Sequence, residues 1–88
     1  MAEQDFKALC DEKGYGDIMT KEYQPDWYDP MHTHDRSIIA LVLEGRITLE
    51  WEEGSTTYDR GDICEFAAGT LHAEKVGPDG AKAILGFK

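Results

Sequence analysis

Residues 32–45 of the chain are HTHDRSIIALVLEG, and residues 61–72 are GDICEFAAGTLH. The first stretch places two histidines before an apolar run that ends in glycine, and the second ends in a third histidine. Side chains alternate along a strand, so His32 and His34 on one strand would share a face, about 6.5–7 Å apart. A third histidine, His72, would come from a strand distant in the sequence. The two stretches therefore predict strands that gather all three histidines of the chain on one surface.

Outward from these stretches, the sequence predicts one helix followed by short strands. Phe6, Leu9 and Cys10 have helical spacing, which indicates a helix over residues 3–13 that ends at Gly14. Short apolar or alternating segments then recur about every ten residues, which is typical of a β-sandwich or barrel. The expected strands are residues 18–23, 37–43, 46–52, 56–58, 62–66, 71–76 and 81–87.

Glycine and proline mark the expected connections between these strands. Residues 24–30 contain two prolines and two aromatic residues and are expected to form a loop, which would wall one side of a pocket with Trp27 and Tyr28. Turns are expected at Glu44 with Gly45 and at Glu53 with Gly54. Further corners are expected at Gly61, Gly69, Gly77 and Gly80.

The run from Ile38 to Leu43 is apolar on both of its faces. A half-exposed strand would leave one of these faces in water, so a second layer must cover it. In a chain of 88 residues we expect a second subunit to supply this cover rather than another sheet. The run therefore predicts a homodimer.

The charge and the cysteines restrict the possible partners. Eighteen acidic and nine basic residues give a net charge of −9, which repels phosphate backbones and anionic lipid and predicts neither nucleic acid nor membrane as a partner. The sequence lacks a signal-peptide pattern and any stretch of roughly 20 apolar residues, so a cytoplasmic location is expected. Cys10 and Cys64 have no CxxC spacing and are expected to be idle thiols.

The two quoted stretches resemble the two motifs of the cupin family. His32, His34 and Gly45 match the first motif, in which HxH is followed by glutamate and then glycine. The second motif has glycine, proline, glycine and histidine at fixed spacing, and it matches the segment that ends at His72. The resemblance implies a single all-β domain over residues 1–88, a cupin-type β-barrel or jelly roll with one short N-terminal helix. Its helix and connection would occupy residues 1–16 and its barrel residues 17–88.

The resemblance also implies a metal centre. His32, His34 and His72 would bind one divalent metal ion and leave coordination positions open for a small-molecule ligand. The motif-one glutamate is replaced by Ile38, or by Ile39 if the alignment shifts by one, so a carboxylate ligand is expected to be missing. Other motif positions also differ, at Asp26, Ala67 and Val76. Zinc, iron, nickel, copper and manganese all remain candidates.

Glu74 is the candidate for a further role at this site. It lies two positions beyond His72 and would share its face on a regular strand. Such a carboxylate could be a fourth ligand, an acceptor for an imidazole N–H, or a general base and hence a catalytic residue. The alternative is a solvent-exposed position near the end of the strand.

Three functions are compatible with these patterns. The first is a small metal-binding cupin with a three-histidine site open to a small molecule. The second is an iron-dependent dioxygenase of a small thiol or diketone, an analogy that the resemblance implies because thiol dioxygenases of the family have three-histidine sites. The third is a metal-free ligand-binding or sensor barrel. Fold alone does not choose between an enzyme and a binding protein.

Overall fold

The computed structural model describes all 88 residues and contains one helix and six strands. The elements are α1 (Glu3–Lys13), β1 (Asp17–Tyr23), β2 (Tyr28–His32), β3 (Ile38–Trp51), β4 (Gly54–Asp59), β5 (Ile63–Phe66) and β6 (His72–Phe87). All strand pairs are antiparallel. The predicted all-β fold with one short N-terminal helix is confirmed, and α1 has the predicted bounds. No helix has the length and apolar character needed to cross a membrane.

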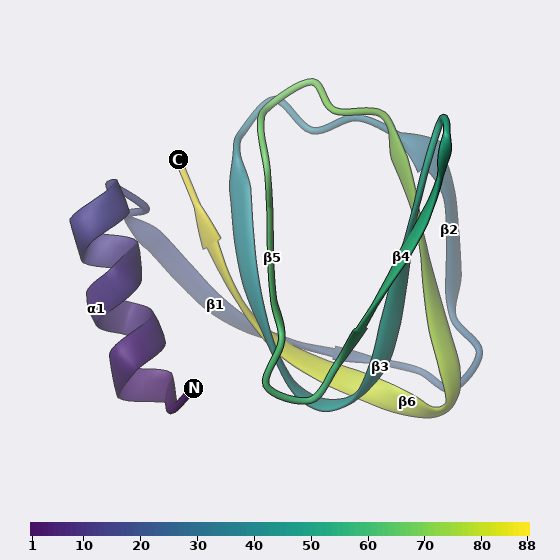
Figure 1. Cartoon of the computed structure of the whole chain (residues 1–88), viewed down its shortest axis with the longest axis horizontal. Coiled ribbons are helices and arrows are strands. Elements are labelled where there is room, and N and C mark those ends of the chain that lie inside the picture. The colour runs from purple at the N-terminus through teal and green to yellow at the C-terminus, as the bar shows by residue number, and fades with distance from the viewer.

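The two long strands, β3 and β6, run through both walls of a barrel. In one wall the first half of β3 pairs with the second half of β6, with β5 beside β3 and β1 beside β6. In the other wall the second half of β3 pairs with the first half of β6, flanked by β4 and β2. Figure 1 shows the strands enclosing an interior, with β5 on one side and β2 and β4 on the other. The arrangement gives inward-facing side chains from both walls a common space.

The turns predicted at Glu44 with Gly45 and at Gly77 and Gly80 are wrong. β3 and β6 continue through these positions, and the pairing register shifts at the bend. Gly45 has a φ of 76°, and a Cβ atom there would lie 2.1 Å from the Gly80 carbonyl oxygen. Glycine therefore permits the two strands to bend together at close contact.

The irregularity in β3 also changes which residues face inward. Ile38, Ala40 and Val42 line the interior before the bend, whereas Ile47 and Leu49 line it afterwards. One additional residue of β3 lies between Val42 and Glu44 relative to β6, so the alternation changes its phase. The bulge thus keeps an apolar face inward along a strand that belongs to both walls.

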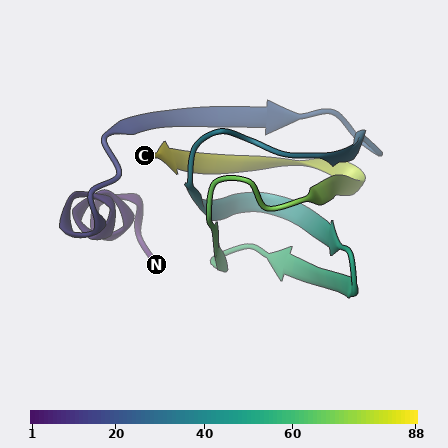
Figure 2. The same cartoon turned by 90° about the horizontal axis from the view of Figure 1, so that it is seen from above.

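The outer face of the apolar run in β3 is covered by α1, so the expectation that a second subunit covers it is wrong. Phe6 and Cys10 of α1 are fully buried against Ile39, Leu41 and Ile84. Figures 1 and 2 show α1 outside the ring of strands, beside the wall that contains β3 and β5. One amphipathic helix is sufficient because only a short stretch of the sheet needs cover. A homodimer stays a prediction.

Polar contacts hold the end of α1 to β5. The Glu65 carboxylate accepts hydrogen bonds from Lys13 Nζ at 2.8 Å and from the Tyr15 hydroxyl at 2.7 Å. Lys88 adds a hydrogen bond from its Nζ to the Lys13 carbonyl oxygen at 3.0 Å. Gly14 ends the helix in the left-handed conformation, as predicted. These contacts join both ends of the chain to the barrel wall.

Candidate metal centre

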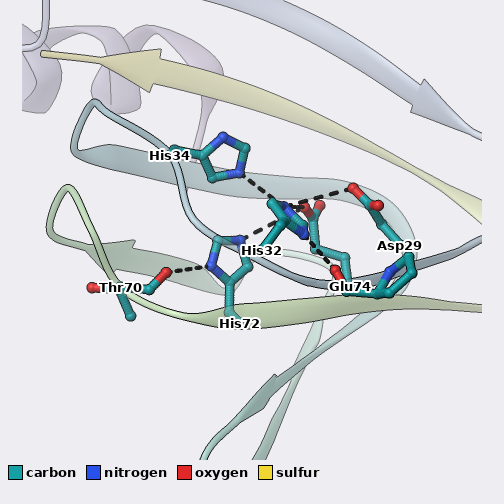
Figure 3. A network of polar contacts seen from close by, with 7 residues as sticks. Asp29, His32, His34, Thr70, His72 and Glu74 are labelled. Atoms are coloured by element: carbon teal, nitrogen blue, oxygen red, sulfur yellow. Dashed lines mark hydrogen bonds and ion pairs between the residues drawn. The ribbon is translucent and has the colours of Figure 1, made fainter.

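The histidines lie where the end of β2, and the loop that follows it, run beside the start of β6. His32, the last residue of β2, pairs with His72, the first residue of β6. His34 lies beyond the end of β2, so the prediction that both residues of the HxH pair occupy one strand is wrong. Its carbonyl oxygen accepts a hydrogen bond from the Gly69 N–H at 2.8 Å, which ties this loop to the one before β6. In Figure 3 the three imidazoles converge, and the His32 and His34 ring centroids are 4.8 Å apart.

His72 is the most deeply buried member of the cluster. Its side chain has no exposed surface, and its Nδ1 lies 2.9 Å from the Thr70 carbonyl oxygen. A carbonyl can only accept, so Nδ1 carries the proton and Nε2 presents a lone pair. That Nε2 is buried and has no hydrogen-bond partner. Burying a nitrogen lone pair without a hydrogen-bond donor costs free energy, and coordination to a metal ion would satisfy the lone pair.

A second backbone carbonyl orients His32 in the same way. Its Nδ1 lies 2.6 Å from the Pro30 carbonyl oxygen, which directs Nε2 toward the cluster. There Nε2 lies 3.1 Å from His34 Nε2. The proton on Nδ1 again leaves the inward nitrogen as an acceptor. Backbone contacts thus leave Nε2 of both His32 and His72 free to bind a metal ion.

Glu74 brings a carboxylate to the histidines. Its Oε2 lies 3.3 Å from His32 Nε2 and 3.8 Å from His72 Nε2, and only 14% of its side chain is exposed. The solvent-exposed alternative for Glu74 is therefore wrong. Ile38, which stands at the place of the motif-one glutamate, faces the interior as an apolar residue, and the carboxylate beside the histidines is that of Glu74 from β6.

The donor set fits a divalent metal ion. One ligand atom from each of His32, His34, His72 and Glu74 lies within 4.8 Å of all the others. Ligands that surround one ion at about 2.0–2.2 Å lie at most about 4.4 Å apart, so the four side chains need to close by only a few tenths of an ångström to bind one ion. Burial, followed by the neighbouring His32 and His72, lowers the pKa of His34 and favours the neutral imidazole that binds metals.

A cavity of about 250 Å³ adjoins the cluster inside the barrel. Thirteen of its 16 lining residues are hydrophobic, and the other three are Lys21, His34 and Glu74. A more open depression shares Met19, His34 and Phe87 with the cavity and adjoins it. The site therefore connects a polar cluster with an apolar space large enough for a small molecule.

The aromatic residues are distributed differently from the prediction. Tyr28 belongs to β2 rather than to a loop and is 52% exposed, and neither it nor Trp27 lines the cavity. Trp27 instead packs on Tyr23, with ring centroids 5.3 Å apart. Tyr58 does line the cavity, and the Trp51 ring lies 6.2 Å from that of His72.

Sequence reasoning missed the positions of three further side chains near the site. Asp29 lies opposite Glu74, with its Oδ2 3.6 Å from His32 Nε2, but it was hidden in the segment predicted as a loop. Cys64 lines the cavity, and burial, followed by the charge of Glu74, raises its pKa to about 12. A protonated thiol is a weak metal ligand. Lys21 also lines the cavity, and its spacing from Met19 and Tyr23 was the available signal.

A two-walled barrel with histidines converging at the start of β6 defines the cupin class of proteins. Residues 19–84 match the family model described as Cupin domain, and the chain belongs to this family. The small single-domain cupin expected from the motifs is thereby confirmed. No curated protein sequence matches the chain.

Several solved structures have the same fold. A protein of unknown function from Rhizobium leguminosarum bv. viciae 3841 is 21% identical, with a TM-score of 0.75 over 80% of this chain and 66% of its own. An RmlC-like cupin from Shewanella frigidimarina is 18% identical, with a TM-score of 0.69 over 80% and 62% of the two chains. An oxalate decarboxylase variant from Bacillus subtilis is 24% identical, with a TM-score of 0.67 over 81% and 20%. The chain thus spans at most about two thirds of these proteins.

Proposed function

We propose that the protein binds one divalent metal ion through His32, His34, His72 and Glu74, and takes a small-molecule ligand in the adjoining cavity. The observation that carries this proposal is the fully buried His72 Nε2, which has no hydrogen-bond partner and faces two imidazoles and a carboxylate. A metal bound there would act as a Lewis acid toward a ligand in the cavity. The imidazoles would hold it through Nε2, with the Pro30 and Thr70 carbonyls fixing two of the rings.

The Glu74 carboxylate changes the net charge of the proposed site. Three neutral imidazoles with Glu74 would leave a divalent ion with a net charge of one, rather than the two expected for histidines alone. Imidazole suits zinc, iron, nickel and copper, whereas the carboxylate also suits manganese. All five metals remain within the proposal.

Elemental analysis of the purified protein tests the proposal. We expect about one equivalent of metal in the wild type and less than a tenth of that in His72→Ala, since outer contacts alone already change metal affinity by about 10–100-fold. His34→Ala, in a more exposed loop, repeats the test if His72→Ala does not fold. Glu50→Gln, a charge-neutralising change on β3 outside the ligand set, is the control. A wild type that neither contains nor takes up zinc, iron, nickel, copper or manganese would contradict the proposal.

A metal-free ligand-binding barrel is the second candidate. It is favoured by the 3.1 Å contact between the Nε2 atoms of His32 and His34, which lets one imidazole donate to the other without an ion. In this case the histidines would hydrogen-bond an organic ligand directly. Wild-type protein that lacks metal and still binds small molecules would support this candidate over the first.

An iron-dependent dioxygenase is a narrower form of the first candidate. The analogy depended on a three-histidine site without a carboxylate, and the position of Glu74 weakens it. Oxygen uptake by the iron-loaded protein with small thiols and diketones tests it directly. Uptake no faster than that of the metal-free protein would leave the binding function.

We also propose a homodimer, formed along β1. This strand pairs only with β6, so its other edge is free, and Ile18 and Met19 on it are 39% and 46% exposed. A free strand edge with exposed apolar side chains is a common site of association. Joining two copies there would bury apolar surface that a small chain leaves in water.

A further inference from the structure

One cation faces the interior of this acidic protein. Lys21 lies in β1 between Met19 and Tyr23, two residues from each, and all three line the barrel cavity. The same cavity is lined by His34 and Glu74 of the metal cluster. Lys21 is the only lysine or arginine among the lining residues. Any ligand that fills the cavity therefore contacts the side chain of one cationic residue.

The Lys21 ammonium rests on aromatic rings and has no carboxylate partner. Its Nζ lies 4.8 Å from the centroid of the Tyr23 ring and 4.9 Å from that of Trp27. Lys21 forms no ion pair and no side-chain hydrogen bond, in contrast to Arg36, which lines the adjoining depression. Arg36 is occupied by Asp17 at 2.7 Å and by the Phe87 ring. The rings fix the position of Nζ while leaving its three N–H donors available.

Packing alone does not account for a lysine at this position. Thirteen of the 16 lining residues are hydrophobic, and methionine would fill the same space as Lys21 without the cost of partly desolvating a charge. The overall charge of −9 also makes an inward cation the exception in this chain. An anionic group on a ligand would supply both the missing counter-charge and the missing acceptors.

We propose that Lys21 recognises the carboxylate of a small organic acid whose apolar body fills the barrel cavity. The inference rests on the proposed function for the metal end of the site, because the ligand would extend from Lys21 toward His34 and Glu74. Its apolar body would contact Val42, Leu85 and Phe87, which line the space between the walls. The ligand class is thus a monocarboxylic acid with a short hydrocarbon chain.

Hexanoate and hexanamide test the proposal, because they have nearly the same shape and differ in charge. Calorimetric titration of zinc-loaded and metal-stripped wild type is expected to show a preference for hexanoate of about tenfold or more, the effect of one charge-assisted hydrogen bond. Lys21→Met should abolish the preference in both forms, and Lys21→Arg should retain most of it. Lys75→Met, the same charge change at an exposed position of β6, should leave it intact.

The outcomes separate this inference from the proposed function. If the wild type takes up no metal but its hexanoate preference disappears in Lys21→Met, the metal proposal fails and the role of Lys21 stands. If Lys21→Met keeps the wild-type preference, or if the wild type shows none, the role of Lys21 is overturned. Metal content and thermal unfolding of each variant show whether the cluster and fold are intact, and Lys21→Gln replaces Lys21→Met if that variant does not fold.

Discussion

At the scale of single residues, backbone carbonyls determine what the histidines can do. The Pro30 and Thr70 carbonyl oxygens accept hydrogen bonds from the Nδ1–H groups of His32 and His72, which leaves Nε2 of each ring as the inward acceptor. These contacts form within two residues of each histidine. Local chain geometry therefore fixes the tautomer of both rings without requiring a metal ion.

Gly45 is the residue whose replacement should most directly disturb the barrel. Gly45→Ala would place a Cβ atom 2.1 Å from the Gly80 carbonyl oxygen, at a φ of 76° that other residues rarely adopt. We expect the free energy of unfolding to fall by about 2–4 kcal/mol, from the conformational cost and the overpacking together. Urea denaturation measures the change.

Gly16→Ala is the matched control for Gly45→Ala. A Cβ atom at Gly16 meets nothing within 4 Å, and its φ is not in the left-handed region. Its free energy of unfolding should change by less than about 1 kcal/mol. Equal effects of the two substitutions would mean that close approach of β3 and β6 at the bend is not what requires glycine.

At the scale of elements, α1 and the bend in β3 together keep both faces of the apolar run in β3 out of water. The helix covers the outer face through Phe6 and Cys10, and the bulge keeps the inner face directed into the cavity. The double-sided apolar pattern was a sound signal of two covered faces. It did not say what covers them, because a helix and a second subunit bury apolar surface equally well.

The contacts of Glu65 with Lys13 and Tyr15, which we call the clasp between α1 and β5, should make the stability of the fold depend on pH. Hydrogen bonds from Lys13 and then Tyr15 lower the pKa of Glu65 from its ordinary value of 4.5. The folded carboxyl group binds a proton less readily than the unfolded one, so the clasp stabilises the fold above pH 4.5 and this contribution is lost as the pH falls below it. The contribution should stay under about 1 kcal/mol because the pair is partly exposed.

Glu65→Gln isolates this effect. Urea denaturation between pH 7 and pH 3 should show a stability difference from the wild type at pH 7 that shrinks toward pH 3. Glu53→Gln, in the exposed turn between β3 and β4, should not show this pattern. A Glu65→Gln difference that stays constant with pH would exclude the carboxylate as its source.

At the scale of the whole molecule, one cavity relates the histidine cluster and Lys21. β6 contributes His72 and Glu74 to the cluster, and β1 contributes Lys21 to the same cavity. The lining of this cavity is mostly hydrophobic, and a less polar surrounding strengthens interactions of charged groups. A ligand can therefore be held by its charge at one end and by the cluster at the other.

The proposed dimer is a prediction at this scale. Sedimentation equilibrium at about 10 μM should give twice the chain mass of 9.9 kDa, and Ile18→Lys should shift the protein toward the monomer because a charged edge strand resists pairing. Met31→Lys, at an exposed position of β2, is the control. A monomeric wild type would contradict the prediction.

The sequence by itself determined the class of the fold and the identity of the histidines. Alternation, glycine spacing and the two motifs are local properties, so the all-β fold, the bounds of α1 and the expectation that His32, His34 and His72 converge could be predicted from them. The turns at Gly45 and Gly80 could not be predicted correctly. A glycine with positive φ serves a bend within a strand as well as a turn between strands.

Only the tertiary structure decided where Glu74 lies relative to the histidines and what covers the sheet. Motif-one glutamate is absent from its place at Ile38, yet the strand pairing of β6 with β2 brings Glu74 to the same histidines from another element. The inward position of Lys21 and the packing of α1 on β3 likewise depend on contacts between distant segments. Sequence patterns report which side chains share a face, whereas pairing register and layer packing determine which faces meet.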